Sequence, residues 1–98
     1  MNRPSLPTAL QDRDAVLRAF LAPDGSLTDI PTRLHKRLVV LDHLAQEFEP
    51  GEKYDETAVN TRLRVFHPDV AALRRYLVDE GFLDRADGLY WRSGGSVS

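Results

Sequence analysis

The sequence predicts an α+β domain of the winged helix-turn-helix class, with an additional N-terminal helix and a short C-terminal β-ribbon as its wing. Three observations predict this class. Apolar residues recur at helical spacing over residues 69–80. Gly81 stands where a helix would end in a left-handed residue. Asp87-Gly88 separates two short apolar runs, as a hairpin turn does. A helix, a glycine stop and a ribbon, in that order, are typical of a winged helix.

The first element is expected to be a helix over residues 12–22, which Pro23 ends. Residues 1–10 contain two prolines and no apolar periodicity, so we expect a flexible lead-in. Residues 26–30 alternate imperfectly and are closed by Pro31, which suits a short edge strand or an extended connection.

The longest predicted helix covers residues 33–49, with Thr32 as its cap and Pro50-Gly51 as its end. Its apolar residues fall at spacings of three and four, as in a helix at the centre of a small core. The predicted buried stripe consists of Leu34, Leu38, Leu41, Ala45 and Phe48.

A helix-turn-helix pair is expected next. Tyr54 indicates a short strand or an extended anchor, and Asp55 can cap a helix over residues 56–66. Pro68 breaks that helix, and Asp69 can cap the last one by accepting backbone N–H groups. The ribbon then follows.

Length and composition indicate one domain with one core. The chain has 98 residues, enough for a single small domain, which we place at residues 11–92. Residues 93–98 are small and mostly polar, so we expect a flexible tail. The sequence shows no internal repeat.

Several classes of protein are disfavoured. No apolar run approaches the roughly 18 to 20 residues that cross a membrane, and the first residues lack the apolar core of a secretory signal. The chain has no cysteine, which excludes disulfides and thiolate zinc ligands. We expect a cytoplasmic protein with no membrane partner.

The charge is slightly acidic overall but unevenly distributed. The formal net charge is -2, which argues against strong electrostatic binding to nucleic acid. Two segments are nevertheless basic, and the alternative is that they are simply solvated helix faces. Their basic residues are Arg33, Lys36 and Arg37 in the first segment, and Arg62, Arg64, Arg74 and Arg75 in the second.

Our first hypothesis is that residues 69–80 enter the major groove of duplex DNA, with the wing near the backbone. Arg75 is the best candidate for a bidentate contact with guanine, and the other basic residues could contact phosphates. Asp84 and Asp87 in the wing would repel phosphate, so we expect weak binding or binding as a homodimer. The alternative for Arg74 and Arg75 is structural: one braces a carboxylate and the other covers apolar surface.

The second hypothesis is a protein-interaction or assembly module without nucleic-acid contact. Tyr90 and Trp91 are neighbours on the predicted ribbon and therefore point to opposite faces. One ring could be left for a partner, and which one is buried is left open here.

An enzyme is not expected. His35 and His43 are eight residues apart on one predicted helix, too far along its axis to share a metal. The serines lie outside any nucleophile elbow, and no glycine-rich phosphate loop is present. We therefore expect no catalytic residues, no metal and no cofactor.

A series of short motifs from Arg13 to Arg92 resembles the bacterial domain of unknown function 2087 (DUF2087). The resemblance implies a winged-helix protein of a bacterial family that occurs alone or joined to transcription-regulator domains, and hence a regulatory setting. It implies no catalytic or ligand residues. The motifs are Asp24-Gly25, Ile30-Pro31, Lys36-Arg37 before an apolar helix, Phe48-Glu49-Pro50-Gly51, Tyr54-x-Glu56-x-x-Val59-Asn60 and Leu73-Arg74-Arg75-x-Leu77-Val78-Asp79.

Overall fold

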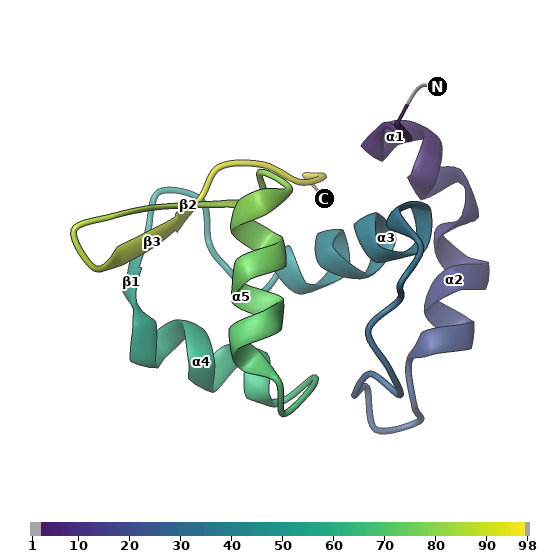
Figure 1. Ribbon diagram of the computed structural model, residues 1–98, viewed down its shortest axis with the longest axis horizontal. Coiled ribbons are helices and arrows are strands. Elements are labelled where there is room, and N and C mark those ends of the chain that lie inside the picture. Colours follow the sequence, from purple (N-terminus) through teal and green to yellow (C-terminus); the bar gives the residue numbers. More distant parts are fainter. Residues whose placement is uncertain (1–2, 98) are drawn as a thin grey trace.

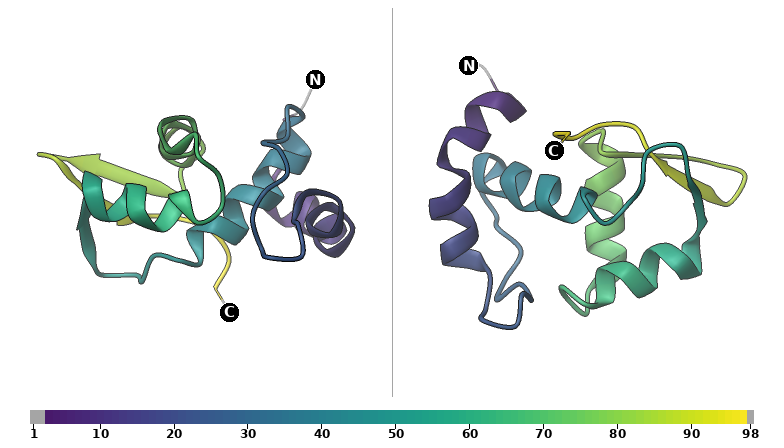
Figure 2. Two further views of the ribbon diagram at one scale, coloured as in Figure 1. Left: turned by 90° about the horizontal axis from the view of Figure 1, so that it is seen from below. Right: turned by 180° about the vertical axis from the view of Figure 1, so that it is seen from behind.

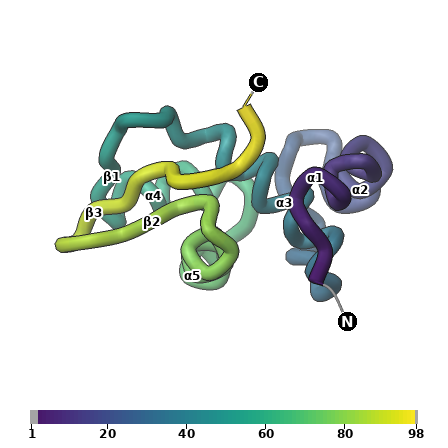
Figure 3. The backbone as a smooth tube through the Cα atoms, turned by 90° about the horizontal axis from the view of Figure 1, so that it is seen from above, coloured from purple at the N-terminus to yellow at the C-terminus, as the bar shows by residue number. Residues whose placement is uncertain are grey.

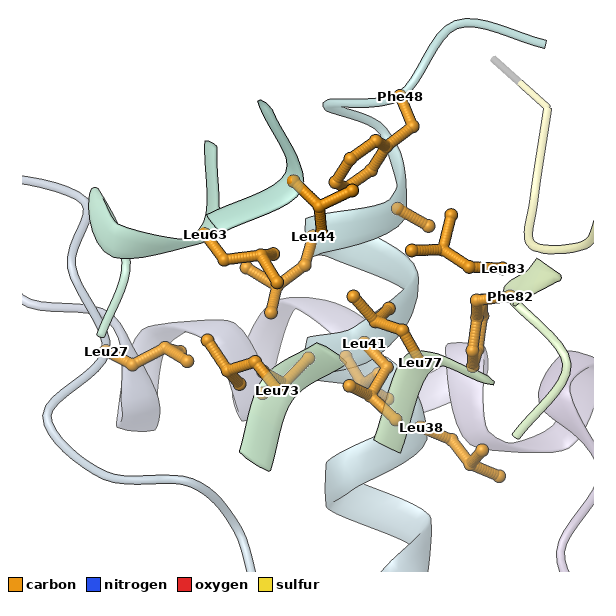
Figure 4. Packing of buried hydrophobic residues seen from close by; sticks show 14 of the residues in the cluster. Leu27, Leu38, Leu41, Leu44, Phe48, Leu63, Leu73, Leu77, Phe82 and Leu83 are labelled. Atoms are coloured by element: carbon orange, nitrogen blue, oxygen red, sulfur yellow. The ribbon is translucent and has the colours of Figure 1, made fainter. Parts of the chain in front are cut away.

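Helix α3 (Leu34–Ala45) runs through the centre of the molecule, because its second half is apolar on nearly every side. The computed structural model describes residues 3–97 and shows the other elements arranged around this helix (Figure 1). The core of the protein takes residues from all the helices, from the connection at Leu27 and from the sheet. Figure 4 shows part of it. Its large buried side chains include Leu41, Leu44, Phe48, Leu63, Leu73, Leu77, Phe82, Leu83 and Tyr90.

The predicted helix-turn-helix pair is present, and both of its caps are confirmed. Strand β1 (Lys53–Asp55) leads into α4 (Glu56–Arg64), and α5 (Val70–Asp79) follows after a turn. The Asp55 carboxylate accepts a hydrogen bond from the backbone N–H of Ala58 at 2.8 Å. Asp69 accepts one from the N–H of Ala72 at 3.1 Å. Each carboxylate satisfies a donor that the first helical turn leaves free.

Gly81 ends α5 as expected. Its φ of 79° is left-handed, and it allows a Schellman closure. In this closure the N–H of Phe82 donates to the carbonyl of Leu77 at 2.8 Å and that of Gly81 to Val78 at 3.1 Å. The chain leaves the helix directly into the hairpin.

The hairpin joins β2 (Leu83–Ala86) to β3 (Leu89–Arg92). Asp87 and Gly88 both have positive φ, 53° and 78°, which is the geometry of a type I′ turn. Figures 2 and 3 show the hairpin extending from the body at the end opposite the N-terminal helices.

Strand β3 lies in the middle of a three-stranded antiparallel sheet with order β1-β3-β2. Tyr54 pairs with Tyr90, and both rings are buried toward the helices. Trp91 is therefore on the other face, where it is only partly covered. This settles which ring of the ribbon is buried. The α+β arrangement is compatible with a winged-helix-like fold.

The N-terminal region differs from the expected lead-in. Residues 6–12 are helical: α1 (Leu6–Ala9) is followed by a 3-10 turn, η1 (Leu10–Asp12). The reason is tertiary, since Ala9 is fully buried in the core beside α3. Helix α2 (Arg13–Phe20) is shorter than residues 12–22, because Leu21 is extended and bridges Leu27. Residues 26–30 thus form an extended connection with one isolated bridge.

Three predicted helix ends were also wrong. Thr32 caps nothing: Arg33 is the N-cap of α3 and makes no side-chain capping bond. Helix α3 stops at Ala45 rather than residue 49, because the next residues form tight turns such as Phe48 N–H to Ala45 carbonyl at 3.1 Å. Helix α4 likewise stops at Arg64 rather than residue 66.

The C-terminal segment is held to α3, unlike the flexible tail expected over residues 93–98. The buried carboxylate of Asp42 accepts the backbone N–H and the hydroxyl of Ser96, both at 2.6 Å. Gln46 donates to the carbonyl of Ser96 at 3.0 Å. Residue 98 lies outside the described residues.

Candidate nucleic-acid interface

The groove between α5 and the hairpin is the clearest concave surface that carries predicted site residues. It has a volume of about 300 Å³. Arg74 and Arg75 line it from α5, and Arg85 lines it from β2. Its other lining residues are Ala71, Val78, Asp79 and Tyr90.

Arg75 is the most accessible of the predicted residues on α5. Its side chain is exposed, as is that of Ala71 one turn earlier. The buried residues Leu73 and Leu77 lie on the opposite side of the helix, so Arg75 sits near the centre of the free face. An arginine in this place is free to contact a ligand.

Arg74 is anchored instead. Its guanidinium donates a short hydrogen bond to the side-chain oxygen of Asn60 and lies 3.6 Å from a carboxylate oxygen of Glu56. The hydroxyl of Tyr90 donates to the same Glu56 oxygen at 3.4 Å. Three elements therefore meet at one carboxylate, which fixes α5 relative to α4 and the hairpin. The structural role that the sequence allowed for Arg74 is present.

Arg37 connects the start of α3 to the free face of α5. It donates to the carbonyls of Pro31 at 3.3 Å and Thr32 at 2.9 Å. Its guanidinium carbon lies 4.6 Å from the centroid of the Tyr76 ring, and that of Arg75 lies 5.7 Å from the same centroid. Cations over an aromatic face are attracted to it. Tyr76 thus holds two arginines from distant parts of the chain together.

We call the group of arginines that lies across α5 the basic band. Its members are Arg37, Arg74, Arg75 and Arg85. Arg37 lies at the α3 end of the band, and Arg85 lies at the hairpin end, over the ring of Tyr90 at 5.5 Å. Arg33 precedes Arg37 by one helical turn and is exposed. It lines a hollow beside Phe20 together with Lys36, so it lies away from the band.

The remaining three predicted residues also lie away from the band. Lys36 lines two hollows beside α2, both of which include Phe20. Arg62 lies over the ring of Tyr54 at 4.6 Å, about half a turn from the side of α4 that carries Asn60. Arg64 is exposed near the end of α4 and makes no ion pair among the described residues.

Acidic residues limit the positive potential of this surface. Asp79 lines the groove itself, one turn beyond Arg75. Asp84 and Asp87 are exposed on the hairpin. Since Glu56 also offsets Arg74, the band offers only a few uncompensated charges. Any electrostatic binding here is expected to be weak.

Arg85 and Tyr76 are the site residues that the sequence analysis missed. Arg85 pairs with Tyr90 in the sheet, so it shares the helix-facing side of the ribbon. Counting back from the Asp87-Gly88 turn could have placed it there. Tyr76 was harder to find, because its neighbour Arg37 comes from a segment 39 residues away.

Two further properties bear on the class of site. Within residues 3–97, no group of three or more His, Cys, Asp or Glu side chains could hold a metal ion. In the same part of the chain, no helix combines the length and the apolar character needed to cross a membrane.

The fold and the band together describe a small winged-helix-like α+β protein with a basic stripe on the last helix of its helix-turn-helix pair. The profile of the family described as "Uncharacterized protein conserved in bacteria (DUF2087)" matches residues 26–92. The chain therefore belongs to the DUF2087 family, as its motifs indicated. No curated protein and no solved structure matches it.

Proposed function

We propose that this chain is a cytoplasmic regulatory module that binds duplex DNA weakly, or as a homodimer, through α5 and the β2–β3 hairpin. The observation that carries the proposal is the basic band: Arg74, Arg75 and Arg85 line the groove between α5 and the hairpin, and Arg37 lies over the same Tyr76 ring as Arg75. In this class of fold, the free face of α5 is the one that enters the major groove.

The roles follow from how each arginine is held. Arg75 is exposed at the centre of the free face, so it is the candidate for a base edge. Arg37 and Arg85 lie on either side of it, where phosphates of the two strands would pass. Arg74 is already paired with Glu56, and its role is to set the angle of α5.

Weak affinity follows from the charges. If about three arginines each neutralise one phosphate, the logarithm of the affinity falls with the logarithm of the salt concentration with a slope of about -3. A homodimer would present two bands and would roughly double this slope.

A titration of labelled duplex DNA by fluorescence anisotropy, repeated at several salt concentrations, tests the proposal. We expect Arg75→Ala and Arg85→Ala each to weaken binding and to reduce the slope by about one. Lys36→Ala is the matched control, because it removes the same charge from a surface beside α2. Absence of binding at low salt would overturn the proposal, as would equal effects of all three substitutions.

One observation favours a second candidate, self-association through the outer face of the sheet. Trp91 pairs with Lys53 on one side and Asp84 on the other, so an aromatic ring lies between opposite charges. The ammonium of Lys53 is 5.5 Å from its centroid. On the same face, Leu89 is 37% exposed. A two-fold axis through Trp91 would bring Lys53 of one copy to Asp84 of the other.

Trp91 is the chain's single tryptophan, so its fluorescence reports directly on this face. If two copies associate here, its emission shifts to the blue as the protein concentration rises, together with an increase in mass by sedimentation. Trp91→Thr should abolish the increase in mass. A constant monomer mass with unchanged emission would exclude this interface.

A further inference from the structure

A second concave surface lies where both ends of the described chain meet the end of α5. It is a hollow of about 370 Å³, which we call the terminal hollow. The apolar side chains of Leu6, Leu38 and Phe82 contribute to its wall, and the last two belong to the core. Its remaining lining residues are Arg3, Pro4, Ser5, Glu80, Gly81 and Gly95.

Glu80 gives the terminal hollow a shielded carboxylate. With the Arg3 side chain in contact, the Glu80 side chain is 11% exposed, which is low for a glutamate at the end of a helix. It follows the last residue of α5, where the helix dipole is negative and favours a cation. The position therefore suits a positively charged group held against an apolar wall.

Arg3 shows which chemistry fits. Its guanidinium forms an ion pair with Glu80, and it reaches the carboxylate on a chain of three methylene groups. The Arg3 side chain is itself 63% exposed and precedes the first helix, which begins at Leu6. Solvent screens such a pair, so a competing cation can replace it at little cost.

We propose that the terminal hollow is a binding site for a small organic cation, a guanidinium or primary ammonium group on a short apolar chain. The cation pairs with Glu80 in place of Arg3, and the chain packs on Leu6, Leu38 and Phe82. The volume is at the lower end of the range for small-molecule sites, which restricts the ligand to a few carbon atoms beyond the cation. The site is distinct from the α5–hairpin groove.

The test uses N-propylguanidinium as the probe and the backbone amide NMR signals of Gly81, Phe82 and Gly95 as the readout. We expect saturable shifts at these amides, with roughly millimolar affinity, because one screened ion pair and a short chain are all that bind. Arg3→Ala removes the internal competitor and should tighten binding about threefold or more.

The role of charge is tested with N-propylurea, which has nearly the same shape and no charge. It should bind the Arg3→Ala protein at least about fivefold more weakly than N-propylguanidinium. Adding Glu80→Gln to Arg3→Ala should remove that difference. Adding Glu47→Gln instead, which changes an exposed carboxylate just after α3, should leave the difference between the two probes unchanged.

Two results would overturn the site: no saturable shift at the three amides in the Arg3→Ala protein, or equal affinities for the charged and uncharged probes. Neither result depends on a Glu80 variant, so the test stands even if that variant fails to fold. No DNA is present in this experiment, so its outcome is independent of the proposed DNA binding.

Discussion

Individual side chains decide how the charges of this protein can be used. Arg74 and Arg75 are neighbours in sequence, yet one is committed to Glu56 and Asn60 while the other is exposed. The difference arises from the helical rotation of about 100° per residue. Arg74 is turned toward α4, and Arg75 is turned toward solvent. A pair of identical residues thus supplies both a brace and a free cation.

His43 makes stability depend on pH. It lies on α3 with its ring edge-on to Phe66, 5.9 Å between centroids. Burial lowers the pKa of His43 from its usual value of 6.5, and the positive charge of Arg13 lowers it further, against smaller opposite effects of Glu47 and Asp42. The folded protein therefore binds this proton less readily than the unfolded chain.

We predict that the contribution of His43 to the free energy of unfolding is fully present above pH 6.5. It falls as the pH drops through 6.5 toward the lower folded pKa, because the unfolded chain takes up the proton first. His43→Phe keeps the ring contact and should flatten this part of the profile in urea denaturation at pH 5 to 7.5. Hydrogen bonds from Ser26 lower the pKa of Asp24 from its usual 3.8. The change in stability that this causes occurs only below pH 3.8, which is outside the range of this measurement. An unchanged slope in His43→Phe would contradict the prediction.

At the level of elements, the caps of the helix-turn-helix pair are the local signals that define its helices. We predict that Asp69→Ala lowers the free energy of unfolding by about 1 kcal/mol, since the N–H of Ala72 loses its acceptor and the helix dipole loses a favourable charge.

The control is Asp79→Ala, at the other end of the same helix. There a carboxylate faces the negative end of the dipole and caps nothing, so its removal should be neutral or slightly stabilising. Urea denaturation measures both variants. Equal losses in the two would show that the cap bond of Asp69 contributes nothing.

The elements that the sequence predicted well are those with such local signals. Asp55, Asp69, Gly81 and Asp87-Gly88 each act within a few residues, and the structure has a cap, a helix stop or a turn at each of them. Helix α1 has no comparable strength of its own. It is one turn long, and its residue Ala9 is buried only because α3 is beside it. Such contacts cannot be read from a short stretch of sequence.

The residues of the candidate interface also divide into those placed by local sequence signals and those placed by tertiary contacts. The exposed position of Arg75 followed from helical periodicity alone. The grouping of Arg37 with Arg75 did not, because it depends on Tyr76 lying between two helices that are distant in sequence. Lys36 belongs to the same basic run as Arg37, yet one residue of helical rotation turns it toward α2. Charge runs indicated which residues to consider, and packing decided which of them share a face.

On the scale of the whole molecule, the two ends of the chain are fastened to its centre. The C-terminal segment returns toward α3 in Figure 1, where Asp42 receives both donors of Ser96. Arg92 supports the same segment by donating to the carbonyls of Gly94 at 3.0 Å and Phe48 at 3.4 Å. Asp42 is 1% exposed, so its buried oxygens depend on these hydrogen-bond donors.

We predict that Asp42→Ala releases the C-terminal segment. Alanine supplies no acceptor, so the backbone N–H and the hydroxyl of Ser96 both lose their hydrogen-bond partner. The expected loss is about 1 to 3 kcal/mol in the free energy of unfolding. Hydrogen exchange should also show the backbone amide of Ser96 losing its protection.

Gln46→Ala is the matched control. It removes a hydrogen bond to the carbonyl of Ser96 but leaves the N–H of Ser96 bound to Asp42, so protection of that amide should persist. If the Ser96 amide stayed protected in Asp42→Ala as well, the carboxylate would not be what holds the segment, and the contacts of Arg92 would have to be sufficient by themselves.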